Sequence, residues 1–585
     1  MVNNYSLLII ILFGTCLRFY GLKWGLPYTF HADEHLFVIR QALRLEYNIF
    51  SNNSLNPEFS SYGTIPLYIF LFVKWIYFKS AYFFQGNIAQ TTTFHFSGFA
   101  DYLKAFYSYE ETSEKIYMPE LFIIGRAISA CLGSISIYLT FVLGKKLYNF
   151  RVGILSALFF ALTVGFIQAS HFFTVDTVLI FFMLLTMMWA ADIFQKRDFK
   201  YYIFAGVSLG LALSVKLTAI ILFLPVIIAH LLRESGTTSR SNSRKICSKE
   251  FICLSVITVL LYLFLNPYSV LDFKNYWGLN ESVTVLGNFF SFYQNKAYDW
   301  NDWRFSYNGN VPYWYDINNV LFFGMGIALE LISGIGLIYS LKKREKSDKF
   351  LLVFVIPFFL IVGSWKVTTM RYILPLIPFV LILGARFLID INSGARVKTV
   401  KYFSVLVIIL VVLSTSFYSL SYANIYSVPD TRIQASDWIY ENVKPNSVIV
   451  LENQYHYTVP LGSNRGLVGV EKSKKPIYNE KILWEYTDNR DQEYIKNHIK
   501  DRLLGADYII VSEWYYKNYT NRLASKLAPA QYGLYKDLFS GTLGYRLIKT
   551  FDSSPNLLGK VFDEVQAELL FKVFDHPKIF IFKKS

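Results

Sequence analysis

Cysteine, charge and nucleotide-binding signatures are all scarce in this chain. Only four cysteines occur in 585 residues. Cys16, Cys131 and Cys253 lie in apolar runs and Cys247 in a basic loop, so no pair stands in a polar region where an oxidising compartment favours a bridge. Charged residues make up 17%, against about 25% in typical soluble domains. No P-loop, dinucleotide fingerprint or zinc-spaced His/Cys cluster is present. We therefore expect no structural disulfide, no cytosolic nucleotide-sugar chemistry and no zinc site.

Long apolar runs are abundant instead, in a chain that is 54% apolar and 18% aromatic. Runs of roughly 15 to 24 residues, close to the length that crosses a bilayer, recur about eleven times. They lie near 5–22, 119–143, 152–169, 172–194, 201–215, 217–232, 250–267, 317–340, 350–364, 372–389 and 402–419. The first lacks a basic n-region and a cleavage site, which favours a retained helix. The pattern predicts an α-helical polytopic membrane protein.

Lysine and arginine cluster after every second apolar run. The clusters fall within 145–151, 196–200, 233–249, 342–349 and 386–401. By the positive-inside rule these segments are cytoplasmic, which places the N-terminus inside and the C-terminus outside. The net charge of +15 therefore reflects membrane topology, and we expect no nucleic-acid partner.

The stretch 201–232 decides whether this alternation holds. Two short spans that turn at Lys216 keep every later basic cluster on the cytoplasmic side. One long helix would invert all spans after it. We predict two spans, with Lys216 at the outer turn.

Three regions then face outward: 23–118, 268–316 and the tail from about 420. The first contains the amphipathic piece HLFVIRQALRLE, which suits the membrane interface. In the tail, DTRIQASDWIYENV has helical periodicity, whereas SVIVLE, ADYIIVSEW and KIFIFKK are short β-type runs. We predict a transmembrane part over 1–420 and a small extracytoplasmic α/β domain over 421–585.

An acidic pair, Asp33 and Glu34, lies just beyond the first apolar run and is flanked by His31 and His35. A solvated acidic loop is the simplest interpretation. The histidines are four residues apart, so on a helix they would share a face and, with the carboxylates, could bind a divalent metal. We favour an orienting role for His31 and expect no cofactor.

Three further charged residues belong to outer ends of apolar runs. Asp176 lies where an ionised carboxylate is costly and functional by default, although capping or pairing would also explain it. Arg371 opens the tenth run and can bind a phosphate or act as an interfacial anchor. Lys216 can likewise bind a phosphate, or its stem can lie along apolar surface while its ammonium group extends to the membrane interface.

We add Tyr62 and Tyr372 as substrate-binding rings. Asp299 and Asp302, in YDWNDW, are a fainter acceptor or metal candidate, or a solvated loop.

Carboxylates, cations and aromatic rings on one outer face suit group transfer from a lipid-linked phosphate. The cations would hold the departing phosphate, and a carboxylate would take the proton of the acceptor hydroxyl. The alternative is a transporter or flippase for a lipid-linked anion, because membrane charges also line transport paths. The large outer loop, the polar tail and the lack of an inverted repeat favour the enzyme.

Several segments, in order over roughly the first 440 residues, resemble the GT-C membrane glycosyltransferases that use polyprenyl-phosphate sugars. Their best-known relatives are the protein O-mannosyltransferases and the lipid A aminoarabinose transferases. The segments are LRFYGL, HADEH, SSYGTIPLYIF, LFIIGRAISACLGSISIYLTFVLGKKLY, GLALSVKLTA, NPY, RYILPLIPF and DTRIQASDWI. HADEH is similar to the family's Asp-Glu motif.

The resemblance implies an inverting single displacement with a polyprenyl-phosphate sugar as donor. Asp33 matches the catalytic base, Glu34 supports it, Asp176 matches a second acidic residue and Arg371 a donor-phosphate contact. Two differences from related families limit the choice of acceptor. Residues 61–63 replace a Lys-Pro-Pro type segment of the aminoarabinose transferases, which argues against lipid A. SEWYY at 512–516 stands where oligosaccharyltransferases carry Trp-Trp-Asp, which argues against whole-glycan transfer to asparagine.

Overall fold

A computed structural model describes most of the chain. The described residues are 2–85, 119–196, 198–234, 248–278, 303–453, 458–461, 478–484 and 491–585. Cys247, Asp299 and Asp302 lie outside these ranges.

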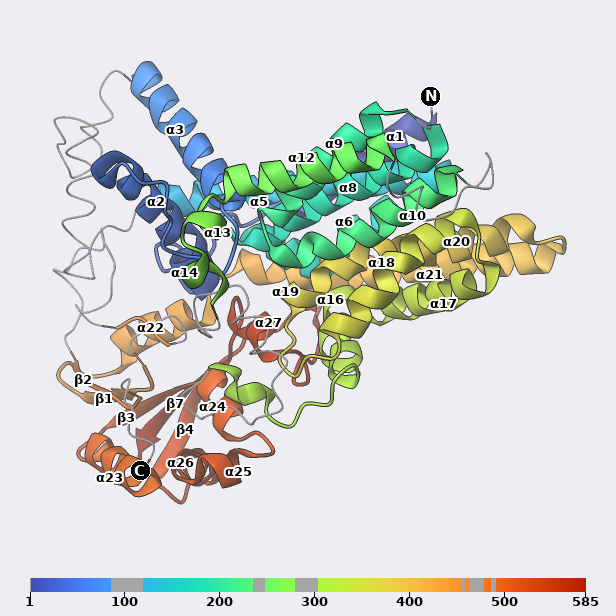
Figure 1. Cartoon of the computed structure of the whole chain (residues 1–585). Coiled ribbons are helices and arrows are strands. Elements are labelled where there is room, and N and C mark those ends of the chain that lie inside the picture. The colour runs from blue at the N-terminus through green and yellow to red at the C-terminus, as the bar shows by residue number, and fades with distance from the viewer. Residues whose placement is uncertain are drawn as a thin grey trace.

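Most of the described chain is a bundle of long helices that run side by side (Figure 1). Its main helices are α1 (Val2–Phe19), α5 (Pro119–Leu147), α6 (Phe150–Leu162), α7 (Val164–His171), α8 (Val175–Lys196), α9 (Lys200–Leu213), α10 (Phe223–Glu234), α12 (Lys249–Leu265), α17 (Ile327–Lys343), α18 (Lys346–Val362), α20 (Ile377–Gly394) and α21 (Lys398–Ala423). These helices are apolar on most faces, as expected of helices that contact lipid and one another. The fold is that of a multi-pass membrane protein.

The number of spans is less simple than the sequence pattern. Within the described ranges, four helices are long and apolar enough to cross a membrane, or up to six if each of two bent pairs forms one span. The bent pairs are α6 with α7, at 55°, and Asp316–Met325 with α17, at 116°. Three further apolar helices are shorter. The count of about eleven spans therefore stays a prediction.

The predicted break in 201–232 is confirmed. α9 ends at Leu213, Lys216 is extended at φ −156° and ψ 129°, and a 3₁₀ turn, Leu217–Leu222, leads into α10. Lys216 therefore lies at a turn between two short helices.

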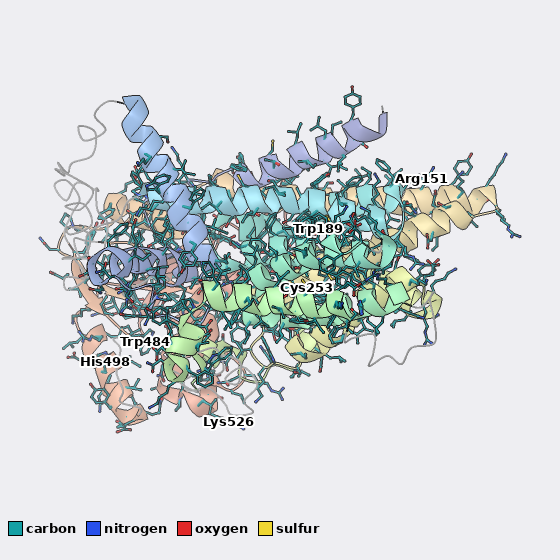
Figure 2. All side chains as sticks on the ribbon, turned by 45° about the horizontal axis from the view of Figure 1, so that its top comes forward. Arg151, Trp189, Cys253, Trp484, His498 and Lys526 are labelled. Carbon is teal, nitrogen blue, oxygen red and sulfur yellow. The ribbon has the colours of Figure 1, made fainter. Side chains whose placement is uncertain are left out.

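The described residues of the basic clusters lie at one end of the bundle, away from the C-terminal sheet. Lys146, at the end of α5, pairs with Asp192 near the end of α8. Ser347, at the start of α18, donates to the Leu147 carbonyl at 2.6 Å. Arg151 lies at this end in Figure 2, whereas Trp484 and His498 of the C-terminal part lie at the other. This arrangement is the one that the alternating charge pattern requires.

One long apolar helix, α3 (Ile65–Gln85), lies in the region expected to be a polar outer loop. It follows α2 (Arg40–Asn52), which includes the end of the predicted amphipathic piece, and it projects from the bundle in Figure 1. Lys74 interrupts the apolar run in the sequence, but it is buried in an ion pair with Glu46 of α2. The sequence pattern missed this helix because the pairing that neutralises Lys74 is visible only in three dimensions.

The C-terminal part contains the predicted α/β elements. A five-stranded sheet has the order β2-β1-β3-β7-β4, with strands β1 (Val448–Leu451), β2 (Asn479–Ile482), β3 (Tyr508–Ser512), β4 (Tyr545–Phe551) and β7 (Ile579–Lys584). β1 is parallel to β2 and β3, and β7 is antiparallel to β3 and β4. The three predicted strands are β1, β3 and β7, and α22 (Thr431–Asn442) is the predicted helix. β4 was missed because its exposed residues do not alternate with buried ones.

A buried polar network fastens this part to the bundle. His576 contacts Asp575 through Nδ1 and Glu564 through Nε2, the latter at 2.6 Å. The other carboxylate oxygen of Asp575 accepts from Tyr422, at the end of α21, at 2.9 Å and from Tyr426, in the 3₁₀ turn that follows, at 2.8 Å. Burial alone would lower the pKa of His576, but the two carboxylates outweigh burial and raise the pKa to about 10.

This network predicts a pH dependence of stability. The folded pKa of His576, about 10, exceeds the usual 6.5, so its contribution is complete below about pH 6.5 and is lost as the pH rises through about 10. We expect the thermal midpoint of the detergent-solubilised protein to fall over this window. In Glu564→Gln, which lacks one of the two carboxylates, the folded pKa of His576 should be lower, so the fall should be smaller and should end at a lower pH. A constant difference between variant and wild type at every pH would contradict this prediction.

Candidate functional site

The acidic pair begins a π-helical turn, Asp33–Ile39, that continues directly into α2. Such turns are rare and occur frequently at functional sites. The turn separates the two carboxylates. Glu34 is fully buried, whereas the Asp33 side chain retains 18% of its exposure. Adjacent residues in the sequence thus have different partners and different access to solvent.

Glu34 forms a bidentate ion pair with Arg126 of α5. The guanidinium Nε and Nη2 donate to the two carboxylate oxygens, each at 2.9 Å. Arg126 also donates to the Trp24 carbonyl at 2.7 Å, and the Phe173 amide donates to Glu34 at 3.0 Å. Glu34 therefore joins the turn to α5 and to the start of α8. With both of its oxygens occupied, Glu34 can support Asp33 by holding the turn in place.

Asp33 belongs to a second cluster, centred on Arg371. Arg371 lies on α19 (Met370–Ile373) and pairs with Asp33 through Nη1 and with Asp176 of α8 through Nε. Lys216 Nζ is 3.7 Å from the other oxygen of Asp176. Four residues predicted from separate parts of the sequence thus meet, and their two positive and two negative charges balance.

Aromatic rings enclose the cation at the helix break. The Lys216 ammonium lies 4.8 Å from the ring centre of Tyr372 and 5.9 Å from that of Tyr62. Burial raises the pKa of the Tyr62 phenol well above its usual value, so the phenol stays neutral and can donate a hydrogen bond. Both rings predicted as substrate-binding residues therefore border the cluster.

The segment that carries Tyr62 is fixed against the break by backbone contacts. The Gly63 amide donates to the Val215 carbonyl at 3.0 Å. A Cβ on Gly63 would lie 2.0 Å from the Ser214 carbonyl oxygen, so only glycine permits this approach. Thr64 donates through its hydroxyl to the Leu265 carbonyl at 2.6 Å, and Asn266 accepts from its amide at 3.2 Å. The sequence segments SSYGT, LSVKLT and NPY therefore meet beside Lys216.

His31 packs between aromatic rings from two parts of the chain. Its ring stacks on Phe574, at 3.8 Å between ring centres, and lies 4.6 Å from Phe172. The ring of His35 lies against Phe122 instead. Within the described ranges, no group of three or more His, Cys, Asp or Glu side chains could hold a metal ion.

A separate cavity of about 230 Å³ lies near the bend before α17. Its walls include Phe323, Tyr418, Phe562 and Glu564. None of the residues around Arg371 lines it. The candidate site is therefore defined by its ion pairs and not by this cavity.

Sequence reasoning missed two charged residues of the site. Arg126 lies in the apolar run 119–143, where the presence of a charged residue by itself indicates a functional candidate. Glu568 precedes α27 (Leu569–Val573) and reaches the start of α19 from the C-terminal part. No local pattern distinguishes Glu568 from other polar residues of the tail.

The buried ion pair predicts a large stability effect. Glu34→Gln leaves the buried Arg126 charge without its carboxylate partner, which should cost about 3–5 kcal/mol of the free energy of unfolding. The matched control is Glu58→Gln, whose pair with Arg44 is exposed, with side chains 47% and 38% accessible; it should cost less than about 1 kcal/mol. Chemical denaturation in detergent measures both. Equal losses would show that the Glu34 pair is not specially important.

Comparison with known proteins places one segment in a family. Residues 120–265 match the family described as dolichyl-phosphate-mannose-protein mannosyltransferase. This segment is about a quarter of the chain and contains Arg126, Asp176 and Lys216. No curated protein matches the chain.

The solved structures that match this chain are distant in sequence. The Archaeoglobus fulgidus oligosaccharyltransferase AglB, in complex with an inhibitory peptide and a dolichol-phosphate, is 14% identical with a TM-score of 0.46, over 92% of this chain and 72% of that one. ArnT from Cupriavidus metallidurans, bound to undecaprenyl phosphate, is 11% identical with a TM-score of 0.43, over 98% and 97%. The mannosyltransferase family match over 120–265 confirms the resemblance to membrane glycosyltransferases that use polyprenyl-phosphate sugars.

Proposed function

We propose that this protein is an inverting glycosyltransferase that moves a single sugar from a polyprenyl phosphate to an acceptor at the outer side of the cell membrane. The observation that carries the proposal is the contact of Arg371 with both Asp33 and Asp176, beside Lys216. This cluster combines a partly exposed carboxylate with two cations. Those are the groups needed to take a proton from an acceptor and to bind a phosphate.

In the proposed reaction, each of these groups has a separate role. Asp33 takes the proton of the acceptor hydroxyl while the hydroxyl oxygen of the acceptor forms a bond to the anomeric carbon. The bond from that carbon to the phosphate oxygen breaks, and the phosphate leaves with the electron pair. Arg371, with its planar fork of donors, and Lys216 stabilise the charge that develops on the phosphate. Attack opposite the leaving group inverts the anomeric carbon.

Asp176 has a different role because it is completely buried. Its two oxygens face Arg371 and Lys216, so it holds the two cations near each other. A buried carboxylate shared by two cations lowers the cost of keeping both cations in an apolar setting. We infer that Asp176 organises the phosphate site, while Asp33 performs the proton transfer.

The membrane orientation supports this placement. The basic ends of the helices lie opposite the sheet (Figure 1), and the positive-inside rule assigns them to the cytoplasm. The N-terminus is then cytoplasmic and the C-terminal part extracytoplasmic. The Arg371 cluster lies at the end of the bundle that faces the C-terminal part. There a lipid-linked donor can present its head group while its lipid chain stays in the bilayer.

Replacing the proposed base tests the reaction. Asp33→Asn should reduce turnover about 10²–10⁴-fold because it removes proton transfer. Binding of the polyprenyl phosphate should be unchanged or tighter, since Asn competes less for Arg371. The measurement is release of polyprenyl phosphate from radiolabelled polyprenyl-phosphate mannose, glucose and aminoarabinose in detergent, with acceptor membranes added.

The control is Asp198→Asn, a change to an exposed pair with Lys200. It should leave turnover within about twofold, because exposed pairs contribute little. Full activity of Asp33→Asn would refute the proposal. Tight donor binding with no release by the wild type would favour a transporter.

Arg371 is tested by binding alone. Arg371→Lys keeps the charge but loses the planar fork, so undecaprenyl phosphate should bind about 10- to 100-fold more weakly. Lys401→Arg, near the start of α21, is the control for a Lys/Arg exchange. Unaltered phosphate binding by Arg371→Lys would remove Arg371 from the donor site.

A further inference from the structure

Glu568 links the C-terminal part of the chain to the helix that carries Arg371. Its side chain is almost completely buried. One oxygen accepts from the Tyr307 hydroxyl at 2.5 Å and from the Leu570 amide at 2.7 Å. The other accepts from the amides of Phe571, at 3.0 Å, and Met370, at 3.5 Å. One carboxylate thus serves four donors from three segments.

The contact with Met370 matters because Met370 directly precedes Arg371. The Met370 side chain is itself confined, since it lies against Gly324 and Gly165, where a Cβ would approach its sulfur at 2.5 and 3.1 Å. The start of α19 is therefore held at its side chain by the bundle and at its amide by Glu568. These two contacts limit how far the Arg371 backbone can move.

Neighbouring backbone contacts hold Glu568 in turn. Its amide donates to the Asn319 carbonyl at 3.0 Å, and the Asn319 side chain donates to the Gln566 carbonyl at 2.6 Å. Asn319 belongs to a second π-helical turn, Asp316–Leu321. The segment 566–571 therefore connects this turn with α19.

The charge of Glu568 also acts on the cluster. Burial raises the pKa of Glu568, and its amide and hydroxyl donors oppose that rise. Glu568 interacts electrostatically with Arg371 as well as with Tyr372. Glu568 thus restrains the backbone next to Arg371 through the Met370 amide and also attracts the Arg371 guanidinium electrostatically.

We propose that Glu568 is a positioning residue that holds Arg371 in the geometry for binding the donor phosphate, so that the C-terminal part completes the phosphate site. This inference rests on the proposed function of Arg371. It assigns Glu568 no contact with substrate. It predicts a coupling between two residues 197 positions apart in the sequence, carried by the Met370 amide.

The sharpest variant is Glu568→Ser. Serine is a good helix N-cap and can still accept from Leu570 or Phe571, but it is too short to reach Met370 and Tyr307. We expect undecaprenyl phosphate to bind this variant about 5- to 30-fold more weakly. The comparison variant is Tyr307→Phe, which removes a contact to the other oxygen and leaves the Met370 contact, so its affinity should stay within about twofold. Binding is measured in detergent at matched ionic strength.

A double-mutant cycle with Arg371→Lys separates positioning from general damage. If Glu568 acts through Arg371, Glu568→Ser should have little further effect on phosphate binding in the Arg371→Lys background. Independent, multiplying effects would overturn the inference, as would wild-type affinity in Glu568→Ser. If Glu568→Ser does not fold, as judged by its thermal midpoint, Glu568→Asp carries the same expectation because it keeps the cap and the charge with a shorter reach. Wild-type affinity of Arg371→Lys alone would instead overturn the proposed phosphate role of Arg371.

Discussion

The cost of leaving a charge unpaired in an apolar interior governs this structure. Each buried ion must find a partner, because the desolvation of an isolated charge outweighs most single stabilising contacts. The pairs that result join distant segments: Glu34 with Arg126, Lys74 with Glu46, and Asp176 with both Arg371 and Lys216. Helices whose apolar faces are interchangeable in lipid thereby acquire one specific arrangement.

The same constraint explains why the two members of the acidic pair, Asp33 and Glu34, have different surroundings. Glu34 is fully enclosed and satisfied, so it fixes the π-helical turn on the bundle. Asp33, on the next position, faces the partly exposed cluster and shares its arginine with Asp176. A rigid carboxylate next to the proposed base suits the requirement that catalytic groups be held within a fraction of an ångström of their working geometry.

The C-terminal part is more than an appended domain. Its sheet has its own core, but Asp575 and Glu568 make buried contacts with the membrane helices. Phe574 stacks on His31 close to the acidic pair. The membrane helices and the C-terminal part therefore meet at the candidate site. We expect a movement of one relative to the other to change the position of Arg371.

The sequence by itself determined the class of fold, the break at Lys216, three strands and one helix of the C-terminal part, and the members of the cluster from Asp33 to Arg371. These follow from local patterns: apolar length, charge alternation, strand periodicity, and the rarity of charge in apolar runs. Tertiary structure alone decided that α3 is a helix and that Arg126 and Glu568 belong to the site. It also gave Asp33 and Glu34 different ion-pair partners and different exposure. The physical reason is that the partner of a buried charge can lie hundreds of residues away, and sequence spacing carries no record of that pairing.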